Sequence, residues 1–230
     1  MFLLNAWKAN NILFGKMDWK QIYKEIGAIQ DKPSKHVVEI IPYFRKNGVK
    51  KILDHGCGTG RHFKFLLNHG FETFGTDYSE EAISYTKNIV GEEFAKNLYV
   101  SDMSTIPFED YYFDAIISSQ TIQHALKPSR DKAISEIKRT LKINGLVFLR
   151  TISQKQTGFG LGELIEENTY TNIPGLVDGK NPHHYFSREE LSEYFFDFNI
   201  ILLKHYSNIP MNKHFSNGLE EWVLLARKIK

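Results

Sequence analysis

The chain has 230 residues, enough for one domain with a large hydrophobic core. Basic residues number 29 and acidic residues 27, with no long basic run, so the sequence carries no strong nucleic-acid signal. A single cysteine excludes an internal disulfide and a cysteine-based metal cluster, and no apolar stretch of about 18 residues is present to span a membrane. Because residues 1–15 do not resemble a signal peptide, we expect a cytoplasmic protein.

Strands and helices alternate through the first two thirds of the sequence. Apolar runs and glycine stops predict strands over residues 51–54, 72–76, 98–101, 113–118 and 146–151. Helical spacing and capping residues predict helices over residues 18–30, 34–47, 61–69, a segment that begins at Ser79, and 129–142. Such alternation indicates a parallel sheet covered by helices on both faces.

The last third of the chain departs from this alternation. Residues 153–186 are glycine-rich, and we expect an irregular insert that acts as a lid. A capping box at Ser187 predicts a helix, and two strands follow at 197–206 and 220–228. Because the connection between these strands is too short for a helical crossover, they are expected to pair as an antiparallel hairpin.

These elements predict an α/β fold. We expect a Rossmann-like doubly wound sheet of about seven strands, mostly parallel, with one antiparallel strand in the C-terminal hairpin and helices on both faces. Residues 1–48 would form an N-terminal helical cap segment, and residues 49–230 would form the main domain with the insert at 153–186, in a single domain overall.

The first strand leads into a glycine turn that reads Asp54-His55-Gly56-Cys57-Gly58-Thr59-Gly60-Arg61. Glycines allow a sharp bend and a close approach of ligand to backbone, and the helix that follows offers its N-terminal amides to a negative group. The dinucleotide fingerprint is G-x-G-x-x-G, whereas the spacing here is G-x-G-x-G. This difference disfavours a NAD-linked oxidoreductase.

The turn resembles the [DE]-x-G-x-G-x-G motif of class I S-adenosylmethionine (SAM) dependent methyltransferases, and four further landmarks resemble that family in order. These landmarks are Asp77 at the end of the second strand, Asp102-Met103, the strand from Phe113 to Gln120 with Ile106-Pro107-Phe108 before it, and Leu141 to Leu146. The fifth landmark carries Ile-Asn where the family has Pro-Gly. The resemblance covers residues 18–151 and the terminal hairpin.

The resemblance implies SAM as the cofactor. An acid about twenty residues beyond the glycine turn is placed to grip the ribose hydroxyls, which is the role expected for Asp77. In the family, the counterpart of Asp102 binds the adenine amino group, and that of Asp54 braces the turn and faces the methionine amine. The residues expected to bind the cofactor are Tyr23, Asp54, Gly56, Cys57, Gly58, Gly60, Asp77, Tyr78, Asp102, Met103 and Ser119.

Three residues are candidates for catalysis. His124 follows the fourth strand, where the family lines its reaction site, and it could take a proton from an acceptor or hold a backbone group. His184 and Tyr185 end the insert beside His183, where they could line the acceptor pocket. Adjacent histidines share no helical face, and no third ligand lies nearby in the sequence, so no metal site is expected.

The sequence thus predicts methyl transfer from SAM to a small-molecule acceptor by a monomer or homodimer. The alternatives are an RNA or protein methyltransferase and a non-catalytic SAM-binding protein. An added binding domain or a strongly basic face would favour the first alternative, and the chain has neither. Binding without turnover would favour the second.

Overall fold

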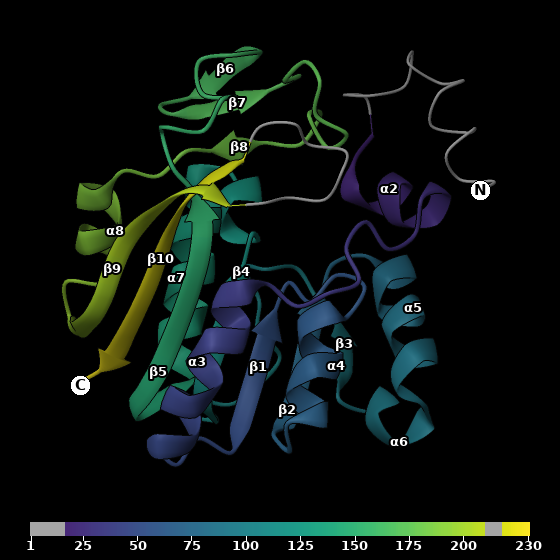
Figure 1. Cartoon of the computed structure of the whole chain (residues 1–230), viewed down its shortest axis with the longest axis vertical. Helices are drawn as coiled ribbons and strands as arrows, with labels where there is room; N and C mark the ends of the chain where they lie inside the picture. Colours follow the sequence, from purple (N-terminus) through teal and green to yellow (C-terminus); the bar gives the residue numbers. More distant parts are fainter. Residues whose placement is uncertain (1–16, 210–217) are drawn as a thin grey trace.

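A computed structural model describes residues 17–209 and 218–230, and a seven-stranded sheet runs through its centre (Figure 1). The strand order is β3-β2-β1-β4-β5-β10-β9. The strands are β1 (Lys51–His55), β2 (Glu72–Asp77), β3 (Leu98–Val100), β4 (Phe113–Ser119), β5 (Leu141–Ile152), β9 (Phe198–Ile209) and β10 (Leu219–Lys228). Only β10 runs antiparallel to its neighbours β5 and β9. The expected Rossmann-like sheet with an antiparallel hairpin strand is confirmed.

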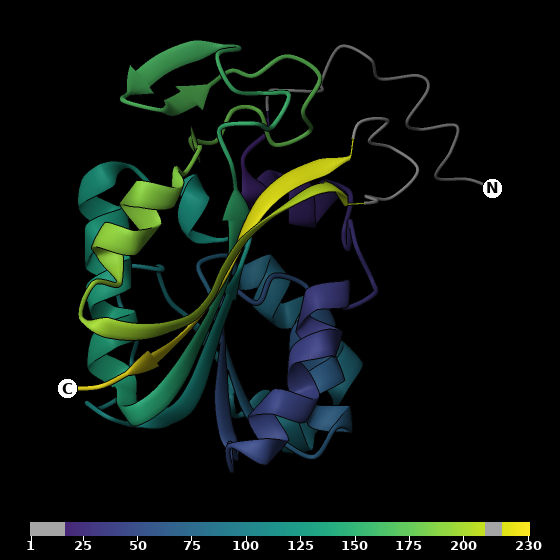
Figure 2. The same cartoon turned by 60° about the vertical axis from the view of Figure 1, so that its left-hand side comes forward.

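Helices cover both faces of this sheet (Figure 2). One face carries α3 (Lys35–Lys46), α4 (Arg61–Asn68) and α5 (Glu80–Val90), and the other carries α7 (Lys127–Thr140) and α8 (Arg188–Tyr194). The short helices are α2 (Trp19–Glu25), α6 (Glu92–Ala95) and the 3-10 turn η1 (Ile122–His124).

The central strand β4 shows why the sheet is apolar throughout. Ile116 packs in the cluster that contains Ala133 of α7 and Leu191 of α8. Its neighbours Ala115 and Ile117 face the opposite way and pack with side chains of α3 and α4. Alternate residues of a strand point to opposite faces, so a strand covered on both sides must be apolar at every position.

Several element boundaries differ from the sequence-based expectation. The first helix ends at Glu25 rather than near residue 30, because Gly27 adopts a φ of 76° and so breaks the helix. The helix expected over 129–142 begins at Lys127 and ends at Thr140, after which the chain enters β5 at Leu141. Tertiary pairing of Leu141 with Phe113 of β4 overrides the helical pattern there.

The insert 153–186 is more ordered than the expected irregular loop. It contains a three-stranded antiparallel sheet of β6 (Glu163–Glu166), β7 (Thr169–Thr171) and β8 (His183–His184). Asn168, with a φ of 56°, turns the chain between β6 and β7.

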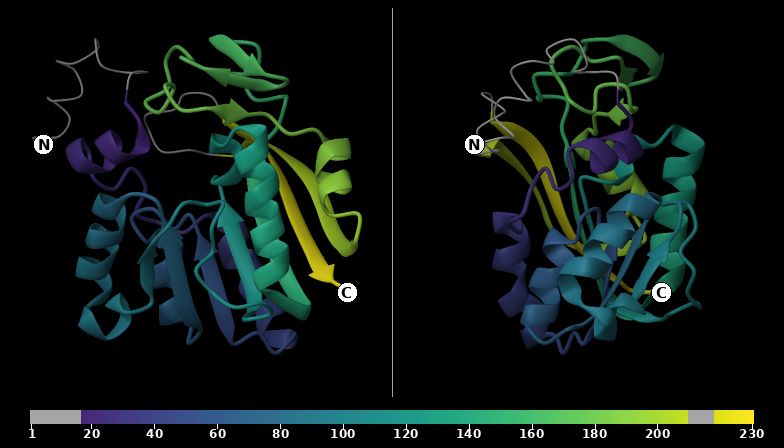
Figure 3. Two further views of the ribbon diagram at one scale, coloured as in Figure 1. Left: turned by 180° about the vertical axis from the view of Figure 1, so that it is seen from behind. Right: turned by 90° about the vertical axis from the view of Figure 1, so that its right-hand side faces the viewer.

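The insert and α2 lie at the end of the main sheet where β1, β4 and β5 finish (Figures 1 and 3). The division into a 1–48 segment and a 49–230 domain stays a prediction, and residues 1–16 of that segment lie outside the described residues. Among the described residues, no helix has the length and apolar character needed to cross a membrane.

Candidate active site

The glycine turn after β1 is held tightly by its surroundings. The backbone amides of Gly56 and Cys57 both donate to the carbonyl of Thr76 at the end of β2, at 2.8 and 2.9 Å. Gly56, with a φ of 74°, lies so close to Thr121 that an added Cβ would come within 2.2 Å of its Cγ2. Both the backbone conformation and the space at this position therefore require glycine.

Asp77 connects the glycine turn with the next helix. Its Oδ2 accepts a hydrogen bond from the Gly58 amide at 2.9 Å, and its Oδ1 accepts one from the Ser79 amide at 3.0 Å. Burial raises the pKa of Asp77, and these backbone donors oppose that shift. The carboxylate is thus fixed at the carboxyl end of β2, beside the turn.

Helix α2 lies over the same turn. The Tyr23 hydroxyl stands 2.8 Å from the position that a Cβ on Gly58 would take, and the Trp19 ring stacks on Tyr23 with centroids 5.6 Å apart. Burial raises the pKa of the Tyr23 phenol well above its usual value, so this group stays a neutral hydrogen-bond donor. Lys20 adds a contact to the Tyr78 ring, with its Nζ 5.4 Å from the ring centroid.

Asp54 lies beneath the turn and does not face the cavity. It is 1% exposed, and neither carboxylate oxygen has a hydrogen-bond partner in the part of the chain that the structure describes. Burial raises the pKa of Asp54 to about 7, against the opposing influence of Arg61. Cys57 is also buried, with a pKa raised by burial, and packs against Phe63 and Leu98. It is a packing residue and not a nucleophile.

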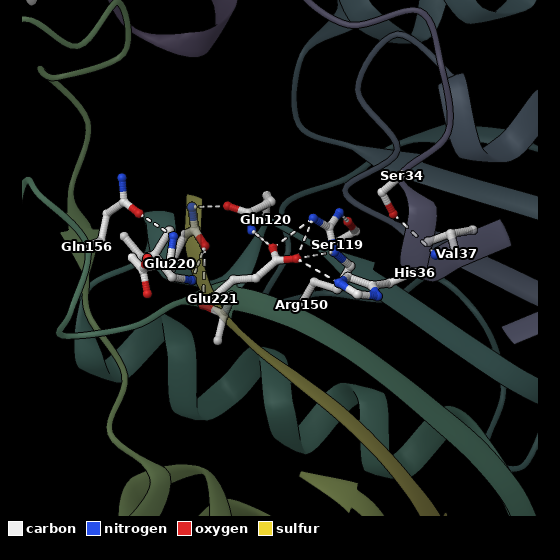
Figure 4. A network of polar contacts seen from close by, with 12 residues as sticks. Ser34, His36, Val37, Ser119, Gln120, Arg150, Gln156, Glu220 and Glu221 are labelled. Atoms are coloured by element: carbon white, nitrogen blue, oxygen red, sulfur yellow. Dashed lines mark hydrogen bonds and ion pairs between the residues drawn. The ribbon is translucent and has the colours of Figure 1, made fainter. Parts of the chain in front are cut away.

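A buried polar network lies where β4, β5 and β10 meet α3 (Figure 4). Arg150 makes two hydrogen bonds through Nη2 to the carboxylate of Glu221, at 2.9 and 2.7 Å, and its Nη1 donates to Ser119 Oγ at 2.9 Å. Gln120 donates to the same carboxylate at 3.0 Å, and His36 Nε2 lies 3.5 Å from it. This network holds these polar side chains in place beside the glycine turn.

Three polar side chains meet at the far end of the site. His124 Nε2 lies 3.9 Å from Asp178 Oδ2, and His183 Nε2 lies 3.7 Å from the same oxygen. The two imidazole rings meet edge to face with centroids 4.7 Å apart, and the edge of Trp19 packs on His124. Burial and then the neighbouring His183 lower the pKa of His124 to about 4, so its imidazole is neutral at neutral pH.

A cavity of about 1060 Å³ joins these groups. We call it the central cavity; it extends from the glycine turn and Asp77 to His124, His183 and Tyr185, beneath α2 and the insert. The predicted cofactor residues that line it are Tyr23, Gly56, Cys57, Gly58, Asp77, Tyr78, Asp102, Met103 and Ser119. Asp54 and Gly60 do not.

Of the three catalytic candidates, two line the central cavity and one does not. His124 and Tyr185 line the central cavity, whereas His184 lies outside it. The ring nitrogens of His184 bond Thr169 Oγ1 at 2.8 Å and the Glu190 carboxylate at 2.9 Å, so this histidine joins β8 to α8. The structure also brings Asp178 to the two histidines as a third ligand group, which the sequence did not predict.

Several cavity residues were missed by sequence reasoning: His36, Gln123, Arg150, Gln156 and Asp178. The sequence contained a signal for Arg150, because a charged residue within the apolar run of β5 needs a buried partner. The partner, Glu221, lies 71 residues away, and no local pattern links the two. Asp178 is in a loop without periodicity, so nothing in the sequence singles it out.

Comparisons with known proteins agree with this geometry. Residues 53–149 match a family model described as a methyltransferase domain. A protein of Mus musculus named "Probable tRNA methyltransferase 9B" is 34% identical over 111 residues, which cover 47% of this chain and 23% of that relative. The chain thus matches less than a quarter of the length of that curated relative.

Solved structures share the fold. A SAM-dependent methyltransferase from Methanosarcina mazei superimposes with a TM-score of 0.70 at 20% identity, over 82% of this chain and 97% of that one. A Burkholderia thailandensis 1,6-didemethyltoxoflavin-N1-methyltransferase, solved with bound 1,6-didemethyltoxoflavin and S-adenosylhomocysteine, gives a TM-score of 0.68 at 16% identity, over 91% of this chain and 85% of that one.

Fold and site define a Rossmann-like protein whose ligand cavity opens at the carboxyl ends of its parallel strands. Residues 53–149 thus match a methyltransferase domain, on a fold shared with solved SAM-dependent methyltransferases.

Proposed function

We propose that this chain transfers a methyl group from SAM to a small-molecule acceptor. The observation that carries the proposal is the central cavity, which runs without interruption from the glycine turn to the insert. At about 1060 Å³ it exceeds the roughly 300–1,000 Å³ of a pocket for one drug-sized ligand. It therefore has room for the cofactor and for a small acceptor beside it.

The residues at the glycine turn fit SAM in size and charge. A Cβ at Gly58 would fill the narrow space under the Tyr23 hydroxyl, so glycine keeps the cradle open. Asp77 offers carboxylate oxygens for ribose hydroxyls, and we assign Asp102, whose Oδ1 accepts bonds from Ser104, to the adenine. Arg61 lines the cavity and has no ion pair within the described residues, which leaves its guanidinium for a carboxylate.

SAM, when bound, supplies a methyl group activated by its sulfonium. The chain has to hold the acceptor in line with that methyl group and to exclude water. Trp19, which contacts both Tyr23 and His124, connects the cofactor end of the cavity with its far end. We assign the far end, at His124 and Tyr185, to the acceptor.

The proposal is tested by incubating the protein with SAM labelled in its methyl group and a panel of small oxygen, nitrogen and sulfur acceptors. Total tRNA and a bulk protein extract serve as further acceptors. We expect label in a small molecule with the wild type and none with the Asp77→Ala variant. Binding of SAM without transfer to any acceptor would contradict catalysis and favour a SAM-binding module.

Transfer to RNA is the second candidate, because the mouse relative is named as a tRNA methyltransferase. Two features favour a small acceptor instead. The formal net charge is only +2, and α2 and the insert, which lie over the carboxyl ends of the strands (Figure 3), both contribute residues to the cavity lining. Label found in tRNA but in no small molecule would decide for the second candidate.

A further inference from the structure

Three metal-ligand side chains from three separate segments converge on the far end of the central cavity. His124 ends the η1 turn after β4, Asp178 lies in the insert, and His183 begins β8. One potential ligand atom from each lies within 4.8 Å of the others. All three residues line the cavity. Two imidazoles and one carboxylate are a ligand set used for zinc and for other divalent transition metals.

We propose that His124, Asp178 and His183 bind one divalent transition-metal ion of the zinc type, at the end of the cavity assigned to the acceptor. The ion would hold an acceptor through a coordinating oxygen or sulfur atom. The acceptor part of this inference rests on the proposed function, whereas the metal site itself does not.

The distances are close to those that such an ion requires. With metal–ligand bonds of about 2.0–2.2 Å, ligand atoms in a tetrahedral site lie roughly 3.4 Å apart. His124 Nε2 and His183 Nε2 lie 3.9 and 3.7 Å from Asp178 Oδ2. Side-chain rotations that move these ligand atoms by roughly a few tenths of an ångström would therefore bring the two pairs to bonding geometry.

The surroundings of His124 orient it as a ligand. Its Nδ1 lies 3.1 Å from the carbonyl oxygen of Pro182. A carbonyl oxygen only accepts hydrogen bonds, so the ring nitrogen that faces it has to be the protonated donor. The proton is thereby placed on Nδ1, and Nε2 keeps the lone pair directed toward Asp178. A hydrogen bond from the other ring nitrogen to a carbonyl is the usual support of a metal-bound histidine.

Two contacts would be exchanged on binding. Gln123 Nε2 lies 3.3 Å from His124 Nε2, and its amide also donates to Gln120 at 2.9 Å, so it keeps a partner when the first contact is lost. His183 Nε2 lies 3.1 Å from the carbonyl of Asp178, which places a proton on that nitrogen. On binding, the proton would move to Nδ1, and Nε2 would turn from the carbonyl to the ion.

Charge and hydrogen bonding favour an ion at this place. The Asp178 side chain is only 16% exposed, and within residues 17–209 and 218–230 its ion-pair partners are the two histidines alone. A dication at this place would neutralise the Asp178 carboxylate. The buried Tyr185 residue lines the same cavity, and its hydroxyl has no hydrogen-bond partner in the described chain, so it is available to a ligand in the cavity.

Three protein ligands leave a coordination position open, as in catalytic rather than structural zinc sites. That position would face the cavity. A metal-bound hydroxyl or thiol acceptor has a lowered pKa, so a proton can leave to solvent before attack on the methyl carbon. Attack by the acceptor would form a new carbon–oxygen or carbon–sulfur bond as the carbon–sulfur bond of SAM breaks, with the electron pair of the broken bond left on sulfur.

The test uses Co²⁺ as the probe, because its visible absorption reports four-coordinate binding, and Zn²⁺ as the competitor. The full chain is stripped with chelator and titrated with Co²⁺. We expect one ion per chain, displaced by Zn²⁺, and affinity at least about tenfold weaker in His183→Gln and in Asp178→Asn. His69→Gln is the matched control, because His69 is half-buried at the end of α4, away from the cavity lining, and its side chain bonds the Phe65 carbonyl at 2.8 Å.

No absorption at saturating Co²⁺, or equal affinity in the ligand variants and in His69→Gln, would overturn the metal site. Asp178→Asn keeps size and a polar side chain, so it remains informative if His183→Gln does not fold. Each variant is also titrated with S-adenosylhomocysteine. Retained cofactor binding with lost Co²⁺ binding supports the metal site, whereas failure of the wild type to bind S-adenosylhomocysteine counts against the proposed function alone.

Discussion

At the scale of single residues, Asp54 stands out as a buried acid. It is a carboxyl group at 1% exposure without a hydrogen-bond partner among the described residues. Its sequence position, two residues before the first glycine, suggested contact with the cofactor. The structure instead places it under the turn, where its charge influences Arg61 and is influenced by it.

The raised pKa of Asp54 makes a prediction about stability and pH. The pKa is about 7 in the folded chain and 3.8 without burial, so the stability it contributes is present below about pH 4 and is lost as pH rises to about 7. The loss is on the order of 4 kcal/mol, at 1.36 kcal/mol per pKa unit. The free energy of unfolding of the wild type, relative to that of Asp54→Asn, should fall between about pH 4 and about pH 7 and stay constant above that range.

Urea unfolding of both proteins at several pH values measures this difference. The comparison with the variant is needed because burial also lowers the pKa of His55 and His62, which changes wild-type stability in the opposite direction. A difference between the two proteins that is constant from pH 4 to pH 8 would show that Asp54 is not buried as a neutral acid.

Gly56 gives a second prediction at the residue scale. An alanine there would carry both an unfavourable φ of 74° and a Cβ placed 2.2 Å from Thr121 Cγ2. Gly70→Ala is the matched control, with a φ of 81° and no heavy atom of the described chain within 4 Å. We expect about 1–2 kcal/mol of destabilisation for Gly70→Ala and about 2–5 kcal/mol for Gly56→Ala. Equal losses in thermal unfolding would mean that Thr121 moves aside freely.

At the scale of elements, the Arg150–Glu221 pair ties β5 to β10. The two side chains are 4% and 0% exposed, and their partners Ser119 and Gln120 come from β4 and the residue after it (Figure 4). A buried pair of this kind is costly to break from one side, because the remaining charge stays desolvated.

A double-mutant cycle tests this coupling. Arg150→Met should cost about 3–5 kcal/mol, and the Arg150→Met/Glu221→Leu variant should cost less than the sum of its single changes. Lys127–Asp131 provides the exposed comparison, at the same kind of distance (2.8 Å) but with 65% and 44% exposure. Its coupling should be below about 1 kcal/mol. Additive losses at the buried pair would contradict a shared network.

The element scale also shows where sequence reasoning reached its limit. Strands such as β4 were predictable because burial on both faces demands an unbroken apolar run. The small sheet of the insert was not predicted, because its strands are only two to four residues long and are too short to show a hydrophobic period. The end of α7 was misplaced because pairing of Leu141 with Phe113 is a tertiary contact.

At the scale of the whole molecule, the order of the strands brings the cofactor candidates together. β1, β2 and β4 are neighbours in the sheet, so the glycine turn, Asp77 and Ser119 meet at one edge although they span 64 residues of sequence (positions 56 to 119). This half of the site follows from local motifs and the fold. The far half does not, because Asp178 and His183 reach His124 only through the path of the insert.

The most direct test of the account is calorimetric titration of the purified full chain with SAM, and separately with NADH. Asp77→Ala is titrated in parallel. We predict that the wild type binds one SAM per chain and no NADH. Binding of SAM should be weaker by about 10- to 100-fold in Asp77→Ala, because charge-assisted hydrogen bonds to the ribose are lost. A folded wild-type protein that binds no SAM would contradict the account, and it would leave the glycine turn as a site for another ligand.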